Sequence, residues 1–171
     1  MRRIAALTRN PAVLALVMAL AVTGCASKKI PNSAADIGLG GGGAGGTARP
    51  GTQQDFTVNV GDRIFFDTDS SVVRADAQQI LARQAQWLNQ YPSYTITVEG
   101  HADERGTREY NLALGARRAA ATRDFLVSRG VPGNRLRTIS YGKERPVAVC
   151  DDISCWSQNR RAVTLLGGAG S

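Results

Sequence analysis

Histidine is nearly absent from this sequence, which contains one, His101, and three cysteines among 171 residues. His101 lies close to Asp103 and Glu104 along the chain, but one imidazole beside two carboxylates falls short of the ligand set that zinc takes in proteins. The sequence therefore predicts no metal site and no bound cofactor.

Long runs of one charge are also missing, although the formal net charge is +7. Removal of residues 1–24 would leave 18 basic and 14 acidic residues, a net charge of +4. This excess is small and interspersed with acids, which argues against nucleic acid as a partner. The glycine run at 38–46 follows no predicted strand and precedes no Gly-Lys-Ser or Gly-Lys-Thr, so a phosphate-binding loop is not predicted either.

No apolar run is long enough for an ordinary membrane-spanning helix. Arg2, Arg3 and Arg9 precede a short apolar stretch at 11–22, which is the pattern of a secretory signal. Val-Thr-Gly-Cys at 22–25 resembles a lipobox, so residues 1–24 are predicted to be cleaved and Cys25 to carry the lipid. Ala26 after the cysteine is typical of sorting to the outer membrane, where the protein would face the periplasm. The alternative is a soluble secreted protein whose cysteine stands there by chance.

Residues 25–55 have almost no apolar periodicity and include the glycine run. This composition predicts a flexible tether behind the lipidated end. As a coil the tether would span about 30 Å, and roughly 100 Å when fully extended. Such a reach would allow an anchored domain at 56–171 to contact a layer some distance from the membrane.

Residues 56–171 show strands alternating with helices. We predict a hairpin of strands at 57–60 and 63–66, a helix ending before Pro92, a strand from Tyr94 to Gly100 and a helix from about Arg108 to Gly130. Two more strands are expected at 136–141 and 162–166. This order implies an α/β two-layer sandwich with parallel crossovers and an antiparallel addition.

The stretch from Gly100 to Ala119 carries the main candidate site. Asp103 follows a strand, and Thr107 is placed to cap the next helix. In that helix Arg118 falls on the same stripe as several apolar residues, where an unpaired charge would be costly. Asp103 could cap a turn and Arg118 could form a structural ion pair with Asp103 or Glu99. Together they could instead bind a zwitterion. The neighbouring Arg105 and Arg108 are interpreted as ordinary surface charges.

Several motifs carry a resemblance to a known family. GHADERGT at 100–107, followed by Tyr110, Asn111 and Leu114 and by ArgArgAla at 117–119, resembles the OmpA-like peptidoglycan-binding domain. YGKERP at 141–146 and NRRAV at 159–163 resemble, within that family, the lipoproteins of the Tol–Pal system. The similarity covers about residues 64–166. It implies a βαβαββ domain with a mixed four-stranded sheet.

The resemblance also implies ligands and partners. In the family, the residues matching Asp103 and Arg118 bind the ammonium and carboxylate groups of diaminopimelate in the peptidoglycan stem peptide. Asp67 matches an acidic loop whose backbone lines the pocket, and Asn111 and Leu114 match further lining positions. The expected partners are peptidoglycan, the outer membrane through the lipid, and the periplasmic TolB-type propeller protein, in a role that links membrane to wall and supports constriction at division.

Two other functions compete with this interpretation. One is a related wall-anchoring lipoprotein outside the Tol–Pal system. The other is a wall hydrolase that would use Glu99, Asp103 and Glu104 as paired carboxylates. Because two of these acids fall in a short exposed turn and no nucleophile with its base is evident, we predict that the protein is not an enzyme.

Cys150 and Cys155 are expected to form a disulfide in an oxidising periplasm. A loop this short contributes only about 2 kcal/mol in the chain-entropy model, which suggests a local staple. A redox-active pair is the alternative, but the spacing differs from the Cys-X2-Cys of thioredoxins. A bridge to another protein is a further possibility.

Overall fold

The computed structural model describes residues 48–169. The predicted anchor, Cys25, and most of the predicted tether lie outside this range. Within it, no helix combines the length and the apolar character that crossing a bilayer requires.

A mixed four-stranded sheet forms the centre of the domain. The strands are β1 (Arg63–Phe65), β2 (Tyr94–His101), β3 (Leu136–Gly142) and β4 (Arg161–Ala169), in the spatial order β1-β4-β2-β3. β4 runs antiparallel to both of its neighbours, whereas β2 and β3 are parallel. This arrangement confirms the predicted mixed sheet of an OmpA-like domain.

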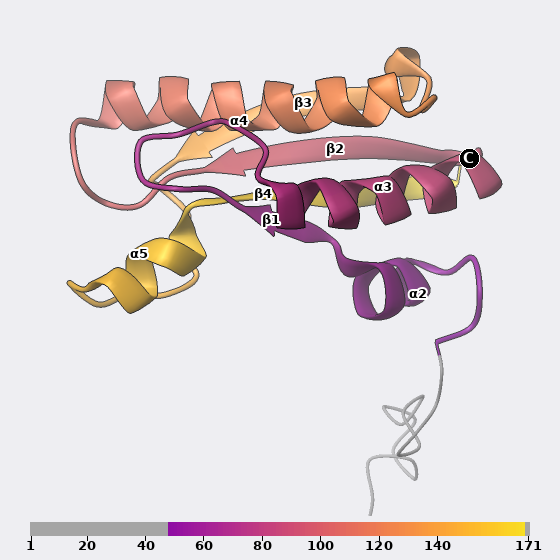
Figure 1. Ribbon diagram of the computed structural model, residues 1–171, viewed down its shortest axis with the longest axis horizontal. Helices are drawn as coiled ribbons and strands as arrows, with labels where there is room; N and C mark the ends of the chain where they lie inside the picture. The colour runs from indigo at the N-terminus through magenta and orange to yellow at the C-terminus, as the bar shows by residue number, and fades with distance from the viewer. Residues whose placement is uncertain (1–47, 170–171) are drawn as a thin grey trace, which may run out of the picture. The chain divides into compact units, whose positions relative to one another are not determined.

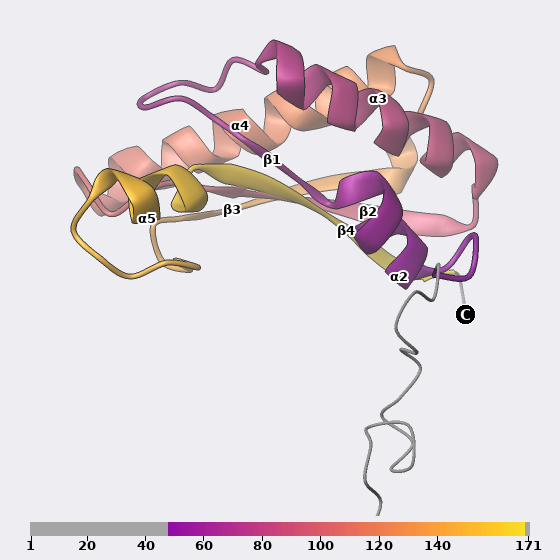
Figure 2. The same ribbon diagram turned by 60° about the horizontal axis from the view of Figure 1, so that its bottom comes forward.

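Two long helices, α3 (Ala75–Gln90) and α4 (Arg108–Ser128), pack on one face of the sheet (Figures 1 and 2). Alternate residues of β2, such as Ile96 and Val98, point into the layer between sheet and helices and are buried. Thr107 caps α4 as predicted, because its hydroxyl accepts a hydrogen bond from the Tyr110 N–H at 3.2 Å. A short helix, α5 (Ile153–Asn159), was not predicted from the sequence.

Two glycines allow α4 to lie close to the sheet. A Cβ on Gly100 would stand 1.9 Å from the carbonyl oxygen of Gly115, and a Cβ on Gly115 would stand 2.4 Å from the Ser140 hydroxyl. No side chain fits at either position, so the backbones of β2 and α4 meet directly here. This contact brings the next turn of α4, with Arg118, up to the end of β2.

The predicted hairpin at the start of the domain is wrong. Residues 57–60 belong to a π-helical segment (Phe56–Gly61) that continues the short helix α2 (Gln53–Asp55), and β1 pairs with β4 instead. The segment is helical rather than a strand because Phe56 is buried against Trp87 and Val60 packs against the same core. The Asp55 carboxylate also accepts hydrogen bonds from Trp87 and, one turn on, from Asn59.

Because of these contacts, the folded domain starts earlier in the sequence than predicted. Ala48 is 7% exposed and Asp55 is 9% exposed, so both are buried. Residues 48–55 therefore pack as part of the domain, and the predicted tether boundary at residue 55 lies inside the folded region.

Candidate functional site

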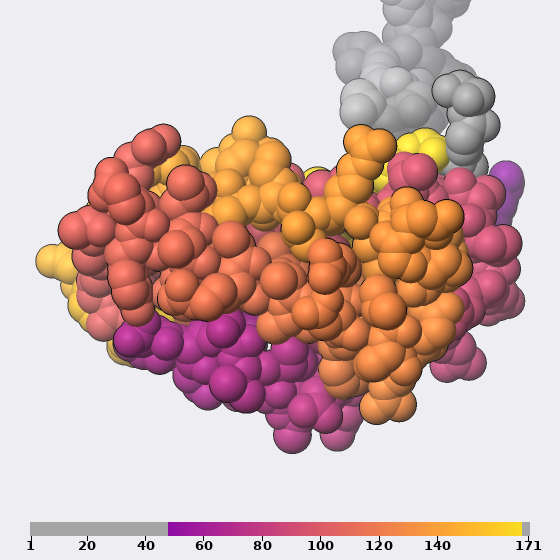
Figure 3. All heavy atoms as spheres, turned by 90° about the horizontal axis from the view of Figure 1, so that it is seen from above, coloured from indigo at the N-terminus to yellow at the C-terminus, as the bar shows by residue number. Residues whose placement is uncertain are grey.

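A pocket of about 310 Å³ opens where β2 ends and α4 begins. The loop between β1 and α3 forms its other wall, and Figure 3 shows this loop lying against the first turns of α4. The pocket is lined by Thr68, Asp69, Asp103, Arg105, Gly106, Tyr110, Asn111, Leu114 and Arg118. Four of the five predicted ligand-binding residues, Asp103, Asn111, Leu114 and Arg118, are thus brought together.

Arg118 is fully buried, and its guanidinium is held by backbone carbonyls. Nε donates to the carbonyl of Ser70 at 2.8 Å, Nη1 to that of His101 at 2.8 Å, and Nη2 to that of Asp67 at 3.1 Å. Within residues 48–169 no carboxylate lies within ion-pair distance of it, so the ion pair considered from the sequence does not form. Since a guanidinium carries five N–H donors, two remain beyond those three hydrogen bonds.

The charge of Arg118 is therefore only partly compensated. Burial lowers the pKa of Arg118 to about 10, with the nearby Arg160 acting in the same direction and Asp103 opposing it. The group remains protonated at neutral pH. A buried cation whose hydrogen bonds all go to neutral acceptors is well suited to a ligand carboxylate, which would supply a directly bound negative charge.

Asp103, 7% exposed, is paired with two arginines instead. Arg105 Nη2 donates to it at 2.7 Å and Arg160 Nη1 at 3.2 Å. Burial alone would raise the pKa of Asp103, but these hydrogen bonds outweigh it and hold that pKa below its usual value. The two pairs differ in accessibility, because the Arg160 side chain is 8% exposed and that of Arg105 is 41% exposed.

The interpretation of Arg105 as an ordinary surface charge is therefore wrong. It lines the pocket and contacts the central carboxylate, whereas Arg108 pairs with exposed Glu144 as a surface residue would. Sequence reasoning also missed Arg160. The available signal was a pair of arginines directly before the apolar residues of a predicted strand, and both arginines are buried.

The acidic loop reaches the site through its backbone, as predicted, but Asp67 itself does not line the pocket. The Asp67 carboxylate turns away to Arg74, at 3.0 Å, and only the Asp67 carbonyl reaches Arg118. Thr68 and Asp69 line the pocket in its place. The Asp69 carboxylate accepts a hydrogen bond from the Tyr110 hydroxyl, and Asp69 has a positive φ of 56°, a conformation that aspartate tolerates better than most residues. No sequence signal distinguished Asp69 from Asp67.

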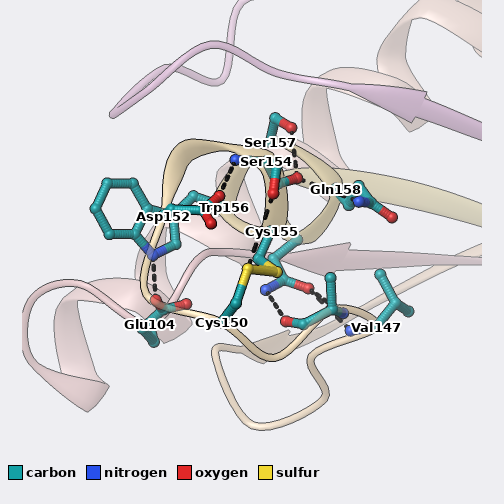
Figure 4. The surroundings of a disulfide bond; sticks show 11 residues. Glu104, Val147, Cys150, Asp152, Ser154, Cys155, Trp156, Ser157 and Gln158 are labelled. Carbon is teal, nitrogen blue, oxygen red and sulfur yellow. Dashed lines mark hydrogen bonds between the residues drawn. A yellow bond between two sulfur atoms is a disulfide. The ribbon is translucent and has the colours of Figure 1, made fainter.

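Asn111 and Leu114 serve the pocket from one face of α4. The Asn111 amide donates to the carbonyl of Arg105 at 2.7 Å, which ties the loop carrying Asp103 to the helix. Leu114 is 5% exposed and adds the apolar part of the lining. The predicted disulfide joins Cys150, in the loop before α5, to Cys155, within α5 (Figure 4).

Comparison with known proteins shows which family the chain resembles. Residues 65–160 match the model of the OmpA family. Over 171 residues the chain is 79% identical to the peptidoglycan-associated lipoprotein of Mesorhizobium japonicum, with all of both chains covered. It is 77% identical over 170 residues to that of Rhizobium meliloti, covering 99% of this chain and 94% of the relative.

Solved structures also resemble this chain. The crystal structure of the peptidoglycan-associated lipoprotein from Burkholderia pseudomallei matches with a TM-score of 0.64 at 39% identity, over 68% of this chain and 100% of that chain. The C-terminal domain of Helicobacter pylori MotB matches with a TM-score of 0.59 at 26% identity, over 63% of this chain and 84% of that one.

Proposed function

Because the chain belongs to the OmpA family, and within it to the peptidoglycan-associated lipoproteins, we propose that it is an outer-membrane lipoprotein that binds peptidoglycan without covalent attachment. The ligand is the diaminopimelate-containing stem peptide. Diaminopimelate presents an ammonium and a carboxylate on one carbon, which matches a pocket with both a cation and acids in its wall.

Arg118 is the observation that carries the proposal. Its side chain lines the pocket, its burial is complete, and its three hydrogen bonds all go to uncharged carbonyls. The two remaining N–H groups, one on each Nη, can take both oxygens of a carboxylate. A ligand carboxylate would thus complete both the hydrogen bonding and the charge of the site.

The ammonium end of the ligand has two acids available. Asp103 is shared by Arg105 and Arg160, and because the Arg105 side chain is 41% exposed, solvent weakens its ion pair with the carboxylate. The contacts of Arg105 with Oδ1 are long, at 3.3 Å, so a ligand ammonium can bind that oxygen while Arg105 and buried Arg160 hold Oδ2. Asp69, which is paired with a neutral phenol, adds a second negative charge on the opposite wall.

The remaining parts of the proposal concern attachment and partners. Lipid on Cys25 would hold the protein in the outer membrane, and residues 26–47 would connect the anchor to the domain. As a component of the Tol–Pal system, the protein would also bind the TolB-type propeller protein and help keep membrane and wall together during constriction. The proposed role is non-catalytic, and the lowered pKa of Asp103 agrees with it, because a general acid at neutral pH needs a raised pKa.

Co-sedimentation with insoluble peptidoglycan tests the proposal. Arg118→Lys keeps the charge, but the three donors of an ammonium would be taken up by the three carbonyls, so affinity should fall by about tenfold or more. Arg123→Ala is the control, because Arg123 lies on the same helix and pairs with exposed Asp124. Equal binding by folded Arg118→Lys and wild type would refute the site, and release of soluble muropeptides by the wild type would indicate a hydrolase.

A further inference from the structure

The residues between β3 and β4 form a closed unit, which we call the cystine segment (residues 147–160). The disulfide Cys150–Cys155 closes it once (Figure 4). The Asn159 amide closes it a second time, because its Oδ1 accepts from Val147 N–H at 2.9 Å and its Nδ2 donates to the carbonyl of Ala148 at 2.8 Å. Asn159 is 1% exposed, so this second closure is buried.

Trp156 connects the cystine segment to the pocket. Its indole N–H donates to the Glu104 carboxylate (Figure 4), and its ring lies 4.2 Å from the guanidinium carbon of Arg105. Arg105 in turn donates to Asp103 at 2.7 Å. One aromatic side chain thus fixes two consecutive residues of the loop that carries the central acid of the site.

The last residue of the segment makes a direct contact. Arg160 follows α5 immediately and donates through Nη1 to Asp103 at 3.2 Å and through Nε to the carbonyl of Phe66 at 3.2 Å. Phe66 precedes the loop that forms the opposite wall of the pocket. Arg160 therefore joins the two walls, and its position depends on where α5 ends.

We propose that the cystine segment is a positioning element for the wall-binding pocket, with Trp156 and Arg160 as its positioning residues and the disulfide as its closure. The proposal rests on the proposed function, since it concerns affinity for the same ammonium-bearing ligand. By fixing the side chains around Asp103 before the ligand arrives, the closed segment removes an ordering cost from binding. Opening the segment should weaken binding without abolishing it.

The size of the effect is limited by other contacts. Asn111 holds the carbonyl of Arg105, and the Lys143 ammonium holds the carbonyls of Glu104 and Gly106. The loop backbone therefore keeps its position when the cystine segment loosens, and only the side chains gain freedom. Immobilising one or two long side chains corresponds to about a three- to tenfold change in affinity.

The test uses the full chain purified in detergent, with insoluble peptidoglycan and a synthetic diaminopimelate-containing stem tripeptide as probes. Two variants loosen the cystine segment in different ways. Cys150→Ser with Cys155→Ser removes the disulfide, and Trp156→Leu removes the contacts with Glu104 and Arg105 while leaving the disulfide intact. Each should bind about three- to tenfold more weakly than wild type. Val149→Ser is the control, because Val149 lies in the same loop and is 88% exposed. It should bind like wild type.

A double-mutant cycle separates positioning from general loosening. In an Asp103→Asn background, Trp156→Leu should cause no further loss of affinity, because its effect passes through the Asp103 carboxylate. Three results would overturn the positioning role. One is a further loss of the same size in the Asp103→Asn background, and the others are unchanged binding by both the disulfide variant and Trp156→Leu, or tighter binding by either of them. Thermal melting of every variant checks that it is folded.

The same measurements keep the two proposals apart. If wild type fails to bind either probe, or if Arg118→Lys binds as well as wild type, the proposed function itself is refuted. If wild type binds, Arg118→Lys does not, and the opened variants behave like wild type, only the positioning role is refuted.

Discussion

Acid should destabilise this domain through one residue, His101. It is the only histidine of the chain, it is 1% exposed, and neither ring nitrogen has a hydrogen-bond partner among the described residues. Burial, followed by the charges of Arg161 and Arg145, lowers the pKa of His101 to about 4. The groups facing the ring also include Tyr141, with centroids 5.6 Å apart, and Glu99, 3.4 Å from Nε2.

The direction and size of the effect follow from linkage between protonation and folding. In the unfolded chain the imidazole titrates near 6.5, whereas in the folded domain it stays neutral until about pH 4. The unfolded state therefore binds the extra proton between these values, and the free energy of unfolding falls as the pH falls through this window. The total loss is about 3 kcal/mol, most of which should be reached by pH 4.5.

Urea unfolding at pH 7, 5.5 and 4.5 measures this loss. Asp55 and Asp103 have lowered pKa values, so the folding stability that their carboxylates contribute is lost at lower pH, below the usual carboxylate range. His101→Phe keeps a ring against Tyr141 but cannot titrate, and its stability should change by less than about 1 kcal/mol over the same range. Equal pH dependence in wild type and His101→Phe would refute the reasoning, and would mean that protonated His101 is stabilised by Glu99.

Three further outcomes are expected. Asp67→Ala should bind peptidoglycan within about twofold of wild type, because only the backbone of Asp67 reaches the site. Asp69→Asn should bind more weakly than that, and equal losses of binding by the two variants in co-sedimentation would contradict this. Gly115→Ala should destabilise the domain by about 2–4 kcal/mol in urea unfolding, since its Cβ would stand 2.8 Å from the backbone oxygen of Gly100, whereas Gly168→Ala, with nothing within 4 Å, should be nearly neutral. Asp55→Ala should cost about 1–3 kcal/mol, because it leaves a buried indole N–H without its acceptor, and unchanged stability would argue against the packing of residues 48–61.

Elements with a clear period were predicted well from the sequence. The alternation from Tyr94 to Gly100 matches β2, and the apolar stripe after Thr107 matches α4 almost to its ends. Both signals are strong because one face of each element is buried in the same core. The segment at 57–60 failed for the opposite reason: four residues fit an alternating pattern as well as a helical one, and contacts with Trp87, distant in sequence, decide between them.

The polar contacts of the pocket were harder to predict. Asn111, Leu114 and Arg118 share one face of α4, so helical phase could place them together. Arg105 meets Asp103 within one loop, two residues along the chain, whereas Arg160 meets it only because the end of β2 lies beside the start of β4, 57 residues apart in sequence. Nothing local to Arg160 indicates which carboxylate it will contact, since that depends on strand order and register.

The acceptors around Arg118 could not be predicted from the sequence, although the need for them could. An arginine on an apolar stripe needs acceptors, and that requirement is met, but by three backbone carbonyls rather than by the carboxylate that was considered. Carbonyls satisfy hydrogen bonds without neutralising charge, whereas a protein carboxylate would have done both and left nothing for a ligand. Asp103, the nearest candidate, is instead held by two other arginines. Keeping the acid and the buried cation apart in this way leaves each with capacity for one end of a zwitterion, which an internal Asp103–Arg118 pair would not.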